Sequence, residues 1–183
     1  KIDNLQQILD NTRNNRPKAQ PNAFGAQWTG LRRGRLEDFD RPIETKSALP
    51  VLDKVAKVLT EEPKNFHVHP KLSKLIQARK QMVETGHLDW AMGELLAYGS
   101  LCVEGTPVRV SGQDCKRGTF THRQAVYFDT ETNAEYCPLA TLNPDKGEFC
   151  IYNSPLSEMA VVGFEYGNSC SDPTYLTVWE AQF

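Results

Sequence analysis

The second half of the chain alternates apolar helical segments with short apolar strands, and this order constrains the fold more than any other feature. The stretch WAMGELLAYGSLCV is apolar on nearly every side, which predicts a buried helix from Trp90 to about Val103 with Asp89 as its N-cap. Further strand-like stretches follow it at 108–110, 125–128, 149–152 and 175–179. Helices that alternate with short apolar strands predict an α/β fold, with an open, largely parallel sheet covered on both faces.

The first 68 residues are polar and irregular, and we interpret them as a connector arm with short helices. Apolar positions predict one short helix around residues 5–9 and another over 52–59. The intervening stretch AQPNAFGAQWTGLRRGRLEDFDRP is rich in loop-forming residues. A helix from Pro70 to about Glu84 then opens the second region, 69–183, which we interpret as an α/β domain truncated at its C-terminal end.

The composition excludes several classes of protein. A formal net charge of -2 gives no whole-chain electrostatic footprint for a nucleic-acid or anionic-membrane partner. The five cysteines form no CxxC pair, which favours reduced thiols.

Because the chain begins at Lys1 and stops at Phe183 directly after a strand-like run, we expect it to be a piece of a longer protein.

The stretch YNSPLSEMAVVGFEYG places one carboxylate at the start of a predicted helix. Ser154 is expected to cap this helix and Pro155 to occupy its first position, so that Glu158 lies in the first turn. The helix follows the strand 149–152, and in open α/β sheets ligands bind beyond the carboxyl ends of the strands. Glu158 is therefore a candidate ligand-binding carboxylate; the alternative is that it only complements the helix dipole.

The same helix carries two glycines four residues apart. Gly163 and Gly167 leave one stripe of the helix without side chains, which suggests a tight packing seam or a subunit contact. A carboxylate beside such a seam would be desolvated and would need a partner.

Two other places in the sequence concentrate polar chemistry. The loop SGQDCKRGTFTHRQAV, residues 111–126, follows a predicted strand and is either a ligand-facing loop or an ordinary surface loop. Glu94 lies in the apolar helix, where it must reach solvent at an edge or be buried with a partner. His67 and His69 have no third ligand at metal-like spacing, so no metal site is predicted.

Three long motifs, in order, resemble one enzyme family. They are LDWAMGELLAYGSLCVEGTPVRVSGQDCKRGTFTHRQAV, YNSPLSEMAVVGFEYGNS and LTVWEAQF. Together they resemble the thiamine-diphosphate-dependent decarboxylating component of the 2-oxoglutarate dehydrogenase complex, and the SGQD-x-x-RGTF-x-HR loop favours this family over pyruvate or branched-chain relatives. The arm resembles it more loosely, through WTGLRR and FHVHPKLSKLIQARKQM.

The resemblance implies a fragment made of a connector and a pyrimidine-binding domain. The implied fold is a three-layer α/β/α thiamine-diphosphate-binding fold with a mostly parallel central sheet, preceded by a partly helical arm. The diphosphate and its Mg²⁺ would be held by a domain outside this chain, and the cofactor site would lie at the interface of a homodimer. A dihydrolipoyl succinyltransferase would be the partner, and the location would be cytoplasmic in a bacterium or the mitochondrial matrix in a eukaryote.

The resemblance also implies roles for individual residues. Glu158 aligns with the carboxylate that hydrogen-bonds the pyrimidine ring of the cofactor and favours its imino tautomer. Leu156 would touch the same ring and Gln182 would lie near it. Glu94 matches a member of an acidic relay between two active sites.

A substrate channel would be bordered by Gln113, Asp114, Arg117, His122 and Gln124. Relatives commonly read HRHAV where this chain has Gln124 as the third residue, and glutamine cannot act as an acid near neutral pH. Either His122 takes over a catalytic role, or the enzyme prefers another 2-oxo acid such as 2-oxoadipate. A further alternative is a non-catalytic module that kept the fold, although the intact Glu158 favours an enzyme.

Overall fold

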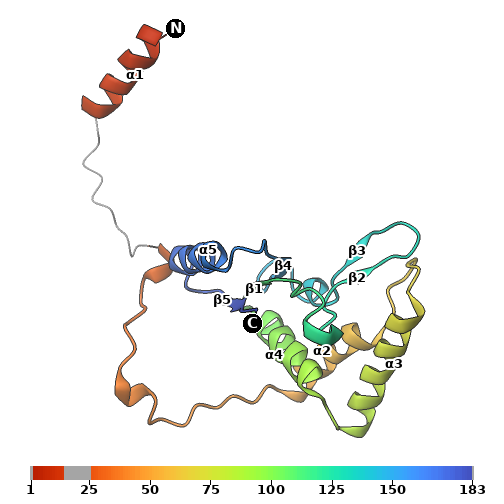
Figure 1. Cartoon of the computed structure of the whole chain (residues 1–183). Helices are drawn as coiled ribbons and strands as arrows, with labels where there is room; N and C mark the ends of the chain where they lie inside the picture. The colour runs from red at the N-terminus through yellow and green to blue at the C-terminus, as the bar shows by residue number, and fades with distance from the viewer. Residues whose placement is uncertain (1, 15–25, 183) are drawn as a thin grey trace. The chain divides into compact units, whose positions relative to one another are not determined.

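The computed structural model describes residues 2–14 and 26–182, and the chain divides into two compact units, residues 1–34 and 35–183 (Figure 1). The first unit contains helix α1 (Ile2–Asn14) and a short 3-10 turn, η1 (Ala26–Trp28). The helix predicted around residues 5–9 is therefore present, and none of its residues is buried. The beginning of the predicted irregular stretch, residues 19–25, lies outside the described residues.

Three helices form the first half of the second unit: α2 (Leu49–Thr60), α3 (Pro70–Thr85) and α4 (Trp90–Glu104). A short 3-10 turn, η2 (Leu36–Asp38), precedes them. The backbone N–H of Met92 donates to the Asp89 carboxylate at 2.7 Å, so the predicted N-cap of α4 is confirmed. The same helix ends at Gly105, whose φ of 93° is a conformation that glycine adopts without strain.

The central sheet has three parallel strands in the order β4-β1-β5. These are β1 (Val108–Gly112), β4 (Phe149–Asn153) and β5 (Leu176–Glu180). The central strand pairs residue for residue with both neighbours, from Val108 beside Phe149 and Leu176 to Gly112 beside Asn153 and Glu180. The parallel sheet predicted from the alternating pattern is confirmed.

The strand predicted at 125–128 is shorter than expected and lies outside this sheet. Only β2 (Tyr127–Phe128) forms, and it pairs in antiparallel fashion with β3 (Glu135–Tyr136). The Asp129 carboxylate accepts backbone hydrogen bonds from Glu131 and Thr132, both at 2.8 Å, and these bonds turn the chain into a hairpin.

Helices cover both faces of the sheet (Figure 1). On one face, Val108 and Val110 of β1 pack into a core with buried side chains of α2 and α4, among them Val55, Leu59 and Leu95. The alternate residues Arg109 and Ser111 face α5 (Glu158–Ser171), which lies against the other side. The structure therefore has the predicted three-layer α/β/α arrangement.

None of the five cysteines forms a disulfide. Among the described residues, no helix combines the length and apolar character needed to span a bilayer.

Candidate functional site at the carboxyl edge of the sheet

The three parallel strands end at the same edge, because Gly112, Asn153 and Glu180 are register partners. The segments that leave this edge contain most of the candidate residues from the sequence. Gln113 begins the loop after β1, Glu158 follows β4, and Gln182 lies two residues beyond β5. This edge is where open α/β sheets bind ligands.

The start of α5 differs from the prediction. The backbone N–H of Ser154 donates to the Gly112 carbonyl at 2.8 Å, so Ser154 continues the strand-like course instead of capping a helix. The helix begins at Glu158, with Ser157 at the N-cap position and no side-chain cap hydrogen bond. The expected roles of Ser154 as cap and Pro155 as first residue are therefore wrong, and Glu158 itself is the first helical residue.

Gln113 and Glu158 meet across this edge. The Gln113 side-chain amide donates to Glu158 Oε1 at 2.7 Å and lies 3.4 Å from the Leu156 carbonyl oxygen. Within residues 2–14 and 26–182, Glu158 Oε2 accepts no hydrogen bond. Leu156 is 83% exposed beside it, which places an apolar side chain next to a half-buried carboxylate.

Gln182 is the last described residue and is exposed. The segment that carries Gln182 leaves the sheet at the same edge as the loop of Gln113. In the described part of the chain, no hydrogen bond joins Gln182 to Glu158.

The other predicted channel residues lie on the loop between β1 and β2. Asp114 accepts a hydrogen bond from Arg117 Nε at 2.7 Å, and both side chains are about half exposed. His122 is exposed, and its Nδ1 lies 2.8 Å from the Thr119 carbonyl oxygen. Gly118 has a φ of 77°, a conformation in which a side chain would be strained, and an added Cβ would also meet the His122 ring at 2.5 Å.

Gln124 turns toward a different part of the molecule. Its side-chain amide donates to the Val126 carbonyl at 3.1 Å, and its φ of 37° is unusual for a residue with a side chain. It lines a pocket of about 480 Å³ whose other walls are His69, Lys71, Leu72, Leu75, Thr121 and Phe128. In the described residues, no hydrogen bond connects either His122 or Gln124 to the Gln113–Glu158 pair.

Glu94 has a buried partner that the sequence reasoning did not identify. Arg123, 2% exposed, donates to the two Glu94 oxygens at 2.8 and 2.9 Å, and it also binds Glu180 and the Cys115 carbonyl. The one sequence feature that indicated such a partner was the position of Glu94 in an apolar helix, where a buried carboxylate needs a cation. Burial lowers the pKa of Arg123, but its hydrogen bonds to Glu94 and Glu180 outweigh this effect and raise the pKa above the ordinary value.

Tyr98 completes this cluster. Its hydroxyl donates to Glu94 Oε1 at 3.3 Å. Burial, together with the nearby Glu94 carboxylate, raises the pKa of Tyr98 to about 12, so the phenol is neutral at physiological pH.

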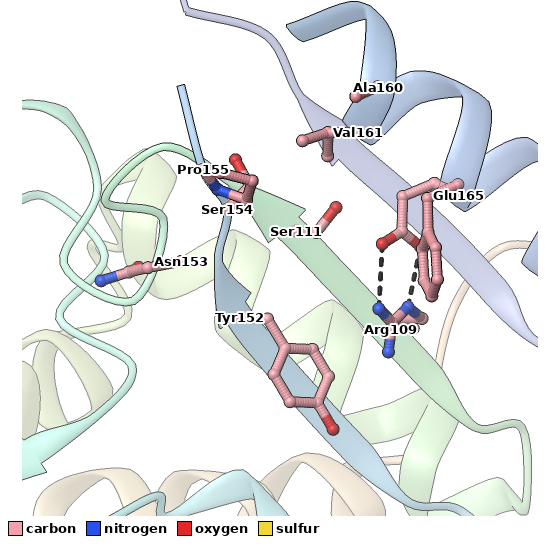
Figure 2. A pocket seen from close by; sticks show the side chains of 10 residues that line it. Arg109, Ser111, Tyr152, Asn153, Ser154, Pro155, Ala160, Val161 and Glu165 are labelled. Atoms are coloured by element: carbon pink, nitrogen blue, oxygen red, sulfur yellow. Dashed lines mark hydrogen bonds and ion pairs between the residues drawn. The ribbon is translucent and has the colours of Figure 1, made fainter. Parts of the chain in front are cut away.

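A second ion pair, also missed from the sequence, joins the sheet to α5 (Figure 2). Arg109 donates to Glu165 through Nε at 2.7 Å and through Nη2 at 3.0 Å. A pocket of about 350 Å³ lies beside the pair, lined by Ser111, Tyr152, Asn153, Ser154, Pro155, Ala160, Val161 and Phe164. The hydroxyl of Ser111 in its wall is buried and has no partner among the described residues.

The two histidines near residue 68 have separate partners, because His69 Nδ1 accepts from the backbone N–H of Lys71 at 3.1 Å whereas His67 faces two carboxylates. His67 Nδ1 lies 3.2 Å from the Asp129 carboxylate, and Nε2 lies 3.4 Å from Glu131. The part of the chain that the structure describes contains no group of three His, Cys, Asp or Glu arranged to hold a metal ion.

The predicted glycine stripe of α5 faces open space. A Cβ added at Gly163 or Gly167 would have no heavy atom of another part of the described chain within 4 Å. The tight seam is therefore not formed within the described residues, and a subunit contact at this stripe stays a prediction.

Comparison with known proteins identifies a family and several relatives. The transketolase pyrimidine-binding domain matches residues 86–183, which include all three strands of the sheet and α5. The 2-oxoglutarate dehydrogenase E1 component of Brucella anthropi is 43% identical over 99% of this chain, which spans 18% of that relative's length. The corresponding proteins of Brucella canis and Brucella suis are 46% identical over 85% of this chain, which spans 16% of their length. The chain belongs to the transketolase pyrimidine-binding domain family.

Proposed function

We propose that this chain is the pyrimidine-binding part of a thiamine-diphosphate-dependent dehydrogenase that decarboxylates 2-oxoglutarate. The observation that carries the proposal is the placement of Glu158 at the carboxyl edge of the parallel sheet, where Gln113 donates to Oε1 at 2.7 Å and Oε2 has no partner among the described residues. The likeness to 2-oxoglutarate dehydrogenase E1 components supports the choice of substrate.

The donor set fits an aminopyrimidine ring. The Glu158 carboxylate is able to share a proton with a ring nitrogen, and the exposed Leu156 offers an apolar surface for the face of the ring. Gln113 fixes the orientation of Glu158, and Gln182 would lie near the ring. When bound, thiamine diphosphate supplies the nucleophilic carbon and the electron sink that release of carbon dioxide from a 2-oxo acid requires.

Other components are proposed to lie outside this chain. A separate domain would hold the diphosphate and Mg²⁺, and a homodimer would bring that domain of one subunit to the pyrimidine site of the other. The succinyl group would pass to a dihydrolipoyl succinyltransferase. We propose a cytoplasmic location in a bacterium or the mitochondrial matrix in a eukaryote.

The loop of Asp114, Arg117 and His122 is proposed to border the substrate channel, and Glu94 to belong to an acidic relay. One observation favours a second candidate substrate, 2-oxoadipate. The neutral amide of Gln124 carries no acid or cation and already donates to the Val126 carbonyl, so a distal carboxylate at the position that 2-oxoglutarate would give it lacks a partner there. A longer 2-oxo acid would place its distal carboxylate elsewhere in the channel.

Replacement of Glu158 by glutamine in the full-length enzyme tests the proposal. We expect turnover of 2-oxoglutarate to fall by about 100-fold, the scale of a lost proton-transfer group, with an unchanged unfolding temperature. Glu135→Gln is a matched control, because Glu135 is an exposed carboxylate that pairs with Lys116 on the β2–β3 side of the loop. Turnover of Glu158→Gln within threefold of the control, with cofactor at saturation, would refute the assignment.

A further inference from the structure

Two polar contacts join the central strand β1 to α5. Arg109 pairs with Glu165 near the beginning of the strand, and Gln113 pairs with Glu158 just beyond its end. Arg109 and Gln113 are four residues apart along the strand direction, roughly 13 Å. Glu158 and Glu165 are seven residues apart along the helix, roughly 10 Å. The helix therefore runs antiparallel to the strand and is attached to it at two widely spaced points.

The space between the two contacts is poorly filled. Ser111, midway between the contacts on β1, and Val161, between them on α5, line the pocket of about 350 Å³ (Figure 2). Val161 and Glu165 are the only buried residues of α5. Within the described part of this chain, close packing therefore does little to fix the helix, and Glu165 is one of its two buried residues.

The geometry of the Arg109–Glu165 pair is suited to fixing a helix. Two parallel hydrogen bonds, at 2.7 and 3.0 Å, restrict rotation as well as separation, which a single contact does not. The Arg109 side chain is itself held, because its guanidinium lies 4.6 Å from the centre of the Tyr152 ring and 5.5 Å from that of Phe164. The Glu165 side chain is 5% exposed, so solvent competes little for the pair.

We propose that Arg109 and Glu165 are positioning residues for Glu158. The pair sets the axial position and tilt of α5 on the sheet, and thereby keeps the first helical residue at hydrogen-bond distance from Gln113. Without the pair, α5 is free to shift toward the unfilled pocket, and the carboxylate at its N-terminus moves with it. The inference rests on the proposed function, since that function gives Glu158 its role.

The test uses the full-length enzyme with Glu165→Gln, which keeps the side-chain volume and removes the charge. The first readout is amide hydrogen exchange of residues 161–164, the first N–H groups of α5 that have a backbone partner, in the protein without cofactor. The second is the dissociation constant of thiamine diphosphate in the presence of Mg²⁺, measured by titration calorimetry. We expect about tenfold faster exchange at the start of α5 and about tenfold weaker binding.

Two further variants separate positioning from a loss of stability. Arg109→Lys keeps the charge but loses the fork, so it should give a change smaller than that of Glu165→Gln. Leu59→Ala, in α2, removes a buried side chain of the core on the opposite face of the sheet and lowers stability without touching α5. It should leave both readouts within twofold of the unmodified enzyme.

The inference is overturned if Glu165→Gln leaves exchange and affinity within twofold of the unmodified enzyme, or if Leu59→Ala weakens cofactor binding as much. Glu158→Gln, measured in the same series, keeps the two proposals distinct. If Glu158→Gln abolishes turnover while Glu165→Gln changes neither readout, the positioning role fails and the proposed function stands. If Glu158→Gln leaves turnover intact, the proposed function fails.

Discussion

Arg123 donates hydrogen bonds to both oxygens of Glu94, at 2.8 and 2.9 Å, from a position 29 residues further along the chain. The same guanidinium binds Glu180 at the end of β5 and donates to the Cys115 carbonyl at 2.8 Å. One buried cation thus connects α4, the end of the sheet and both halves of the loop from Gln113 to Val126. The loop therefore has a fixed base, although much of its surface is exposed.

Replacement of Arg123 by methionine should destabilise the protein by about 3 kcal/mol or more, because Glu94 and Glu180, whose side chains are 27% and 25% exposed, would lose the cation that they share. The measurement is the free energy of unfolding in denaturant. Arg117→Met is the matched control, since Arg117 and Asp114 are about half exposed, and its effect should be less than about 1 kcal/mol. Equal losses for the two variants would contradict the importance assigned to the buried cluster.

His122→Ala should lower kcat/KM for 2-oxoglutarate by about 10-fold or more in the full-length enzyme if this residue supplies the proton or charge that Gln124 does not. Adding Gln124→His to this variant should restore part of the rate. The same series measured with 2-oxoadipate reveals a change of substrate preference. A change below about threefold with both substrates, less than ~1 kcal/mol, would show His122 to be an ordinary surface residue.

Asp129→Asn should destabilise the protein in a pH-dependent way. The backbone N–H of His67 donates to Asp129 at 2.7 Å, and this bond, with those from Thr132 and Glu131, holds the pKa of the carboxyl well below its usual range. The stabilisation is therefore complete above the unfolded-state pKa of about 3.9 and is lost as the pH falls toward the lower folded-state pKa.

The measurement for Asp129 is the difference in unfolding free energy between Asp129→Asn and the unmodified protein from pH 7 to pH 2. The difference should shrink as the pH falls below about pH 4. A difference that grows on acidification would have the wrong sign for this carboxylate. Glu131→Gln is the control, because Glu131 is largely exposed.

Alkylation at pH 8 should discriminate between the cysteines. Burial raises the pKa of Cys102 to about 12 and that of Cys115 to about 11, so both thiols are protonated at this pH and shielded from reagent. Cys170 is exposed on α5 and should react first. Peptide mass mapping after brief treatment with iodoacetamide measures the order, and early modification of Cys102 would contradict the packing around α4.

The isolated chain should not bind thiamine diphosphate with a dissociation constant in the low micromolar range, and it should be inactive. Only the pyrimidine contacts are proposed to lie here, so half of a site would bear the whole loss of ligand freedom on binding. Titration calorimetry in the presence of Mg²⁺ measures the affinity. Low-micromolar binding would place diphosphate contacts within this chain.

The sequence by itself determined the elements with local signals. The limits of α4 follow from Asp89 at its beginning and Gly105 at its end, because capping and left-handed residues act within one turn of chain. Alternation of apolar helices and strands likewise predicted the parallel sheet, and the position of Glu158 after a strand predicted its place at the carboxyl edge of that sheet.

Local signals failed where a distant partner decides the conformation. The sequence predicts a helix start at Ser154 and Pro155. In the structure, the Ser154 N–H donates to the carbonyl of Gly112, 42 residues earlier, and the helix begins only at Glu158. The sequence also did not indicate that Arg123 pairs with Glu94 or that Arg109 pairs with Glu165. A charged residue in an apolar segment indicates that a counter-charge is needed. Which residue supplies the counter-charge depends on how strands and helices from remote parts of the chain pack together.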